Sequence, residues 1–167
     1  CDRTYCPLPD AEAVMRTEGI ALFGWESRRA AADFDILGFS LAHEGCLTNV
    51  LTMLDLAGIP LRSADRRSDD PIIVAGNAMA DAPEPMAPFM DAIVVGEGEE
   101  AVTELIEAYR AAQDGDGESR RRRVIEGWKP LAGVYVPEAY GVAYAADGRI
   151  GSVIPGDASV PAVVVKR

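Results

Sequence analysis

The sequence predicts an α/β fold, in which a mostly parallel sheet is flanked by helices and followed by a small C-terminal β ribbon. Short apolar runs alternate with amphipathic segments along residues 33–112, which is typical of strand–helix–strand units. Glycine turns join these runs to the segments that follow, as in one half of such a unit. Beyond residue 133 the chain changes to short β-prone stretches around Asp147-Gly148, a strong hairpin signal.

Residues 91–112 show this organisation most clearly. Ile93–Val95 form an apolar run of the kind that a parallel sheet buries on both faces. The sequence Gly-Glu-Gly-Glu at residues 96–99 predicts a turn, and the glutamates at the start of the next helix complement its dipole. That helix should bury one apolar stripe, made of Val102, Leu105, Ile106, Tyr109 and Ala112.

The preceding elements follow the same pattern. We predict a helix over residues 10–16 that ends at Gly19. Residues 33–41 run from polar to apolar, as expected of a strand that enters a buried sheet. A helix with one apolar stripe follows over residues 47–57, and residues 71–76 form the next short buried strand. Right-handed crossovers would place these strands in one sheet.

The composition divides the chain into three segments. Residues 1–113 are predicted to form the α/β domain, residues 114–132 a linker with a short helix, and residues 133–167 the β ribbon. The linker itself is Asp114–Glu118, after which Ser119 can cap the helix. The strand-prone stretches of the last segment are residues 134–136, 142–145 and 149–154.

Four consecutive arginines, residues 120–123, lie in the predicted short helix. Such a run can bind nucleic acid, but the chain has a net charge of −11, and polyanions need a basic footprint. We therefore predict no nucleic-acid partner and no membrane partner, since no apolar run approaches the ~18 residues of a membrane span. Two interpretations of the arginines remain, a solvated helix face or a docking surface for an acidic neighbour.

The three cysteines, Cys1, Cys6 and Cys46, are too few and too scattered for a disulfide framework. Cys46, at the start of a helix, could have a lowered thiol pKa, but a small buried hydrophobe is the commoner role. Nothing in the sequence resembles a signal peptide, so we expect a cytoplasmic protein. The chain begins without methionine and ends in the strand-like residues 163–167, so we expect both ends to continue in a longer protein.

Candidate ligand-binding residues follow each of the three predicted parallel strands. Ligands of open parallel sheets bind outside the carboxyl ends of the strands, so these turns could line one crevice. Glycines there allow close approach of the backbone, and serine or asparagine can form hydrogen bonds. The turns are Ser40-Leu41-Ala42-His43-Glu44, Gly76-Asn77-Ala78-Met79 and Gly96-Glu97-Gly98-Glu99.

The charges of the third turn exclude one ligand class. Free N–H groups at a helix start attract phosphate, but Glu97, Glu99 and Glu100 would repel it, and no Gly-Lys-Ser/Thr follows. The glutamates could instead accept hydrogen bonds from hydroxyl or amide donors. Alternatively, they only cap the helix and complement its dipole.

His43 is the only histidine of the chain. A metal site with two imidazoles and a catalytic pair of histidines are therefore both excluded. A lone metal ligand, a general base or a residue without chemistry remains open for His43. We predict no metal ligands and no catalytic residues in this chain.

Several motifs in order resemble the N-terminal, cobalamin-binding-like domain of radical S-adenosylmethionine (radical SAM) proteins. They are Gly38–Leu41, Thr48–Leu61, Pro83–Pro85, Gly96–Glu99 and Leu131–Pro137. The resemblance implies a Rossmann-like fold and a crevice that in related domains holds the nucleotide tail of cobalamin. The implied cofactor-binding residues are Ser40, Leu41, His43, Gly76, Asn77, Gly96, Glu97, Gly98 and Glu99. The parent protein would use a 4Fe–4S cluster and S-adenosylmethionine, bound by a radical SAM core in the same polypeptide.

The chain departs from the family pattern at defined positions. Ser40 matches the serine of a Ser-x-Leu motif, but Ala42 replaces its leucine, and Gly76-Asn77 replaces a Gly-Gly pair. The Asp-x-His-x-x-Gly motif that ligates cobalt and the Cys-x-x-x-Cys-x-x-Cys motif that holds the cluster are both absent from the sequence. We therefore expect weak or no affinity for cobalamin and no radical chemistry by this chain alone.

Three hypotheses for the function follow. The first is an accessory N-terminal domain of a radical SAM enzyme, which is not catalytic alone. The second is a protein-interaction module in which the crevice is vestigial and the segment after Asp114 docks a partner. The third, an independent small-molecule enzyme, is the least favoured, because the chain offers one histidine and no nucleophile with its base.

Overall fold

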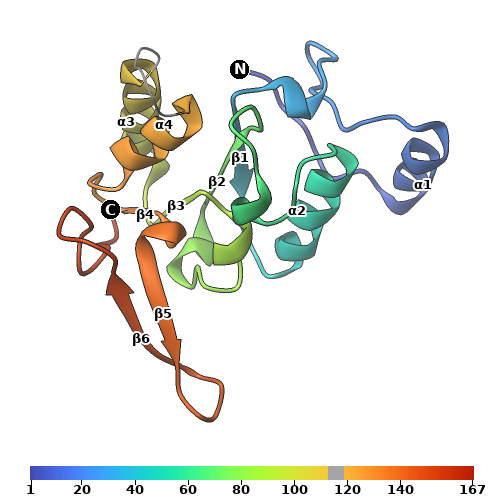
Figure 1. The fold of residues 1–167 in the computed structure, drawn as a ribbon. Helices are drawn as coiled ribbons and strands as arrows, with labels where there is room; N and C mark the ends of the chain where they lie inside the picture. The colour runs from blue at the N-terminus through green and yellow to red at the C-terminus, as the bar shows by residue number, and fades with distance from the viewer. Residues whose placement is uncertain (113–118) are drawn as a thin grey trace.

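A four-stranded sheet forms the centre of the protein (Figure 1). The structure is a computed structural model that describes residues 1–112 and 119–167. The strands lie in the order β1 (Ile36–Ser40), β2 (Ile72–Gly76), β3 (Ala92–Val94) and β4 (Val134–Tyr135). The first three strands are parallel, and β4 is antiparallel to β3. The predicted α/β fold with a mostly parallel sheet is therefore confirmed.

Helices cover both faces of the sheet (Figure 1). One side carries α1 (Pro9–Glu18) and α2 (Gly45–Leu56), and the other carries α3 (Gly98–Ala111) and α4 (Arg120–Trp128). Side chains of β2 point alternately to the two faces and contribute to both apolar cores. Short 3₁₀ turns lie at Ala31–Asp33, Ser63–Asp65, Ala78–Asp81, Ala87–Phe89 and Pro137–Ala139. In the described part of the chain, no helix is long and apolar enough to cross a membrane.

α3 buries only part of the apolar stripe that its sequence predicts, since Leu105 is buried and Tyr109 and Ala112 pack against the core, but the other two residues do not. Ala101 and Leu105 are buried, whereas Val102 and Ile106 are 52% and 39% exposed. α4 packs beside α3, and the indole Nε1 of Trp128 donates a hydrogen bond to the Leu105 carbonyl oxygen at 3.0 Å. This contact and the small Ala101 side chain orient the helix. The prediction that Val102 and Ile106 are buried is therefore wrong.

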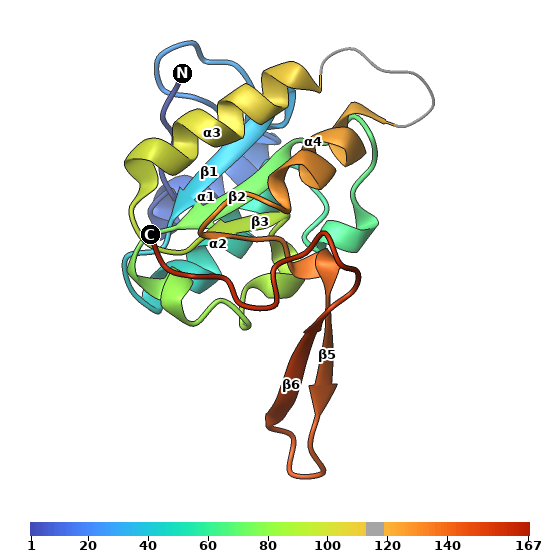
Figure 2. The ribbon, with the colours of Figure 1, turned by 90° about the vertical axis from the view of Figure 1, so that its left-hand side faces the viewer.

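The predicted β ribbon is present as β5 (Tyr140–Tyr144) and β6 (Ile150–Pro155), which pair antiparallel and extend away from the sheet (Figure 2). Gly148, at φ 81°, provides the left-handed residue that the turn requires. Residues 134–136 were expected in the ribbon, but β4 pairs with β3 instead. Val134 is 1% exposed and packs in the core beneath α3 and α4. A strand in the exposed ribbon could not bury this side chain to the same extent.

One arginine of the 120–123 run is not on a solvated helix face, so that interpretation is wrong for Arg121. Arg121, Val124, Ile125 and Trp128 recur at helical spacing and are all buried in α4. The sequence contains this spacing, but the run of four arginines suggests an exposed helix face and draws attention away from it. The acidic neighbour of Arg121 lies within the chain and is Asp91. The predicted linker at residues 114–118 lies outside the described residues.

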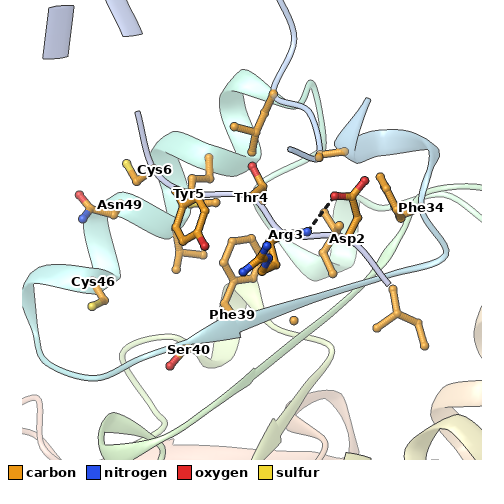
Figure 3. Close-up of a pocket in the computed structure, with 18 of the residues that line it drawn as sticks. Asp2, Arg3, Thr4, Tyr5, Cys6, Phe34, Phe39, Ser40, Cys46 and Asn49 are labelled. Carbon is orange, nitrogen blue, oxygen red and sulfur yellow. Dashed lines mark hydrogen bonds between the residues drawn. The ribbon is translucent and has the colours of Figure 1, made fainter. Parts of the chain in front are cut away.

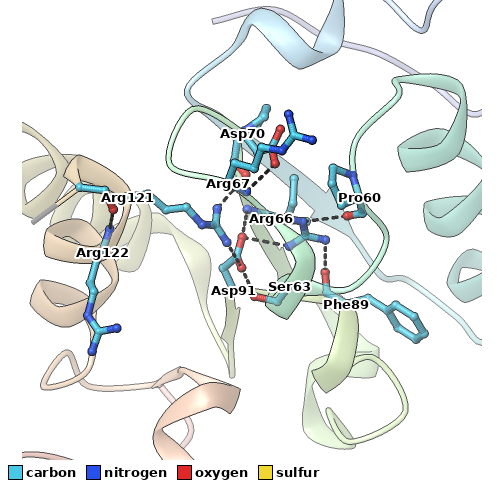
Figure 4. Close-up of polar contacts among 12 residues, drawn as sticks. Pro60, Ser63, Arg66, Arg67, Asp70, Phe89, Asp91, Arg121 and Arg122 are labelled. Atoms are coloured by element: carbon cyan, nitrogen blue, oxygen red, sulfur yellow. Dashed lines mark hydrogen bonds and ion pairs between the residues drawn. The ribbon is translucent and has the colours of Figure 1, made fainter.

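Asp91 is the centre of a buried charge cluster at the start of β3 (Figure 4). Its carboxylate accepts hydrogen bonds from Nη1 of Arg66 at 3.0 Å, from Nη2 of Arg121 and from the Ser63 hydroxyl. It also accepts from the backbone N–H of Ile73 in β2 at 2.6 Å. One side chain thus joins β2, β3, α4 and the loop that precedes β2.

The two guanidinium groups of the cluster also hold backbone carbonyl groups. Arg66 donates to the oxygens of Pro60 at 3.0 Å, Leu61 at 2.7 Å and Phe89 at 2.6 Å (Figure 4). Arg121 donates to the Pro71 oxygen at 2.9 Å. The side chains of Asp91 and Arg66 are both 0% exposed, so the loss of the Asp91 charge would leave a buried guanidinium group without its counter-charge.

We predict that Asp91→Asn lowers the free energy of unfolding by about 3–5 kcal/mol, because it leaves two buried guanidinium groups without their counter-charge. Chemical denaturation of the purified chain would measure the change. Asp35→Asn is the matched control, since Asp35 pairs with Arg120 at 2.8 Å but is 52% exposed. An exposed pair of this kind contributes roughly 0–1 kcal/mol. Equal losses in the two variants would contradict a central role for Asp91.

Candidate functional site

The first two predicted turns lie together at the carboxyl end of the sheet. Ser40 and Gly76 are register partners at the ends of β1 and β2. Asn77 bridges them, since its Nδ2 donates to the Ser40 hydroxyl at 2.9 Å and its Oδ1 accepts from the Ala78 N–H at 2.7 Å. Asn77 has φ 84° and ψ −168°, a backbone conformation that is essentially restricted to glycine and is strained for asparagine. The exposed pair Ser40–Asn77 is therefore held in a defined geometry.

Two further predicted residues of the first turn face different surroundings. Leu41 is 1% exposed, and its side chain belongs to the core on the α2 side of the sheet. Its backbone N–H donates to the Gly76 oxygen at 2.8 Å, which fixes the turn to β2. The side chain of His43 is exposed and lies beside Gly45 at the start of α2. Thus Leu41 supports the turn from below, and His43 projects from its rim.

The third turn is covered by residue Arg167. The Arg167 N–H donates to the Val95 oxygen at 3.1 Å, and the Arg167 oxygen accepts from the Glu97 N–H at 3.3 Å. A Cβ atom on Gly96, which has φ 104°, would lie 2.6 Å from the Arg167 backbone nitrogen. Gly96 is thus required both for its conformation and for the close approach of another backbone.

Side-chain contacts fasten the C-terminal segment to the same edge, which it crosses in Figure 2. Nη2 of Arg167 lies 2.8 and 2.7 Å from the two carboxylate oxygens of Glu104 in α3. Nζ of Lys166 lies 2.7 Å from Asp81. Within the described residues, Nη1 of Arg167 is buried without a hydrogen-bond partner. Two of the predicted glutamates, Glu97 and Glu99, remain exposed beside this segment.

A separate cavity of about 620 Å³ lies between residues 1–6, β1 and α2 (Figure 3). Its volume is within the ~300–1,000 Å³ range of small-molecule sites. Most of its lining is apolar, with Phe39 and Met53 among the contributors. Thr4 and Asn49 add polar groups, and the Thr4 hydroxyl is buried without a hydrogen-bond partner in the described chain.

Among the predicted site residues, Ser40 also borders this cavity, whereas Asn77 and Gly96 do not. The N-terminal segment was not among the predicted site residues. It is held by Asp2, whose carboxylate accepts from the N–H groups of Glu26 at 2.9 Å and Ser27 at 3.1 Å. Hydrogen bonding to Glu26 and Ser27 lowers the pKa of Asp2. Only the tertiary structure brings these distant residues together, so no local sequence pattern marks the cavity.

All three cysteines border the cavity, and all three are free thiols. Burial raises the pKa of the Cys6 thiol, and the nearby charge of Glu12 adds to the effect. Cys6 is therefore protonated at neutral pH and is not an activated nucleophile. No group of three or more His, Cys, Asp or Glu side chains within the described residues could hold a metal ion.

Two motifs that are far apart in the sequence meet at one hydrogen bond. The hydroxyl of Tyr135, in the Leu131–Pro137 segment, donates to Glu84 of the Pro83–Pro85 segment at 2.7 Å. Burial raises the pKa of Tyr135, and the Glu84 carboxylate adds to this shift. The phenol therefore stays protonated and serves as a hydrogen-bond donor that ties the segment before β3 to β4.

Comparison with known proteins gives one match. The family model for the N-terminal region of radical SAM proteins matches residues 1–137. No curated protein matches the chain significantly. No solved structure does so either. Because the matched residues span most of the 167, including the whole four-stranded sheet, the chain belongs to the family of radical SAM protein N-terminal domains.

Proposed function

We propose that this chain is the accessory domain of a radical SAM enzyme, that it is not catalytic alone, and that its cobalamin-type crevice is vestigial. The family places the domain in a radical SAM polypeptide. The 4Fe–4S cluster and S-adenosylmethionine of that polypeptide would be bound by its radical SAM core. The accessory domain would then shape or cover the active site of the core.

The contact between Arg167 and the Gly96 turn carries the proposal. In domains of this architecture, ligands approach the carboxyl ends of the strands through glycine turns. Here the backbone of Arg167 already occupies the space over Gly96, and Glu104 neutralises its guanidinium group. This cover over the turn supports the proposal that the turn does not hold cobalamin.

The side chains at the edge also lack the groups that catalysis or metal ligation would need. The exposed hydroxyl of Ser40 is bonded to the Asn77 amide, which is no base. His43 lies at the rim of the first turn and belongs to no group of three or more metal-ligating side chains in the described residues. These observations support a structural role for the turns.

We predict that hydroxocobalamin titrated into the chain produces no saturable change in its visible absorption spectrum, because Arg167 covers the Gly96 turn. A variant that lacks residues 163–167 provides the comparison, since removal of this segment uncovers the turn. Circular dichroism would confirm that the shortened variant is folded. Tight binding by the intact chain that is lost in His43→Ala would contradict the proposal.

The β5–β6 ribbon provides a specific surface through which the domain could dock. Its exposed apolar side chains include Tyr144 at 67%, Ile150 at 43% and Ile154 at 57% exposed. Neighbouring residues of a strand point to opposite faces, and Val153 is exposed as well, at 38%. An isolated two-stranded ribbon is at best marginally stable in water. We infer that the radical SAM core of the same polypeptide packs on this ribbon.

We predict that Ile154→Asp lowers the melting temperature of the complete polypeptide, since it places a charge in the contact between ribbon and core. In the present chain alone the same substitution should change stability by no more than about 0.5 kcal/mol, because the side chain is exposed. Val14→Asp in α1 is the control, since Val14 is also exposed, at 56%, but lies far from the ribbon (Figure 1). Equal effects of Ile154→Asp and Val14→Asp in the complete polypeptide would count against this docking mode.

A further inference from the structure

A second, smaller cavity of about 220 Å³ lies between the loop that precedes β2 and the start of α4. Its lining is strongly basic, although the chain as a whole carries a net charge of −11. Glu138 is the one acidic residue that borders it among those described. The basic and hydroxyl residues that border it are Arg66, Arg67, Arg121, Arg122, Ser63, Ser68 and Ser119.

The charge cluster at the floor of this cavity is not neutral. Arg66 and Arg121 share the single carboxylate of Asp91, and their side chains are 0% and 9% exposed. The other acceptors of Arg66 and Arg121 are neutral backbone carbonyls, such as that of Pro71. Within the cluster the positive charge therefore exceeds the negative charge by one, and the charge of Asp70 offsets part of this excess, since Asp70 acts to raise the pKa of Arg66. Desolvation lowers the pKa of Arg66, and repulsion by Arg121 contributes to this shift.

Donor groups remain available toward the cavity. In Arg121, Nη1 donates a hydrogen bond to the Pro71 oxygen and Nη2 donates to the Asp91 carboxylate, whereas the Nε–H donates to no described residue. The exposed guanidinium group of Arg67 forms no hydrogen bond or ion pair within residues 1–112 and 119–167. The carboxylate of Asp70 accepts a hydrogen bond from the Arg67 backbone N–H at 2.6 Å (Figure 4).

The start of α4 adds to the positive potential. Ser119 caps the helix, with its hydroxyl accepting from the Arg122 N–H at 3.3 Å. The positive end of the helix dipole therefore lies at the cavity that Ser119 borders. Guanidinium groups present planar pairs of donors that match the oxygens of a phosphate.

We propose that this cavity binds the phosphate group of a phosphorylated small molecule. Its volume is below the ~300–1,000 Å³ of sites that enclose a whole drug-sized ligand, so it would hold the anionic group while the rest of the ligand projects into solvent. The doubly charged phosphate would balance both the excess positive charge of the buried cluster and the charges of Arg67 and Arg122, which also border the cavity. This site lies at the amino end of β3, and the inference is independent of the proposed function of the carboxyl edge.

The test is isothermal titration of the chain with inorganic phosphate and with pyrophosphate, against chloride at matched ionic strength. We expect saturable binding of phosphate, and weakening by about tenfold or more in Arg67→Ala, because a charge-assisted hydrogen-bonding group is lost. Arg67→Lys should weaken binding less, since it keeps the charge but not the planar pair of donors. Arg149→Ala is the control, because this substitution removes the same charge at a residue that is 87% exposed on the ribbon turn.

Three other outcomes would overturn the proposal. The absence of saturable phosphate binding would do so, as would equal weakening in Arg67→Ala and Arg149→Ala, which would indicate a general charge effect. Binding of acetate as tight as that of phosphate would reject the phosphate class. Circular dichroism of Arg67→Ala would exclude unfolding as the cause of a loss, and the exposed position of Arg67 predicts an unchanged spectrum.

Discussion

The buried carboxylate of Asp91 is the interaction on which the rest of the structure depends. It joins segments that the chain order keeps apart, because it binds the backbone of β2 at Ile73, the loop arginine Arg66 and the helix arginine Arg121. The Arg121 contact fixes α4 against the sheet, and α4 in turn orients α3 through Trp128. A charge pair at one end of the sheet thus supports the packing of α3, whose preceding turn lies at the opposite end. Moving either guanidinium group away from Asp91 would break a buried ion pair, so the cluster favours one arrangement of these segments over others.

The sequence predicts those features whose signal is local. Apolar runs and helical spacing suffice for β1, β2, β3, α2 and the existence of α3, and Asp147-Gly148 suffices for the ribbon. The buried face of α3 is not predictable in this way, because it is decided by Trp128, which lies in another helix. Arg121 is an intermediate case. Its spacing to Val124, Ile125 and Trp128 indicates burial, but the residue type argues for solvent until its partner Asp91 is known.

The candidate site shows the same division. Strand order and parallel pairing bring Ser40 and Gly76-Asn77 together. This is expected, because turns that follow neighbouring parallel strands lie at the same edge of the sheet. A glycine with a left-handed conformation signals that something approaches its backbone closely, but the sequence around Gly96 does not say what. In this chain the neighbour is the backbone of Arg167, which lies far from Gly96 along the sequence. The cavity beside β1 is equally invisible to local patterns, because the N-terminal segment that closes it is held by Asp2 on the turn at Glu26 and Ser27.

The two ends of the sheet differ in the sign of their charge. At the carboxyl end, where ligands of parallel sheets usually bind, Glu97, Glu99 and Glu104 make the surface acidic, and Arg167 both covers the turn and pairs with one of these acids. At the amino end, Asp91 is outnumbered by Arg66 and Arg121, so the low-dielectric interior holds excess positive charge. An anion is thus opposed at the customary edge and favoured at the opposite one. At the amino end the excess charge belongs to Arg66 and Arg121, which also hold the fold together, so it cannot be removed without a change in the packing of α4. The exposed Glu97 and Glu99 at the carboxyl end have no such packing role, so the charge of that edge can change while the fold is kept.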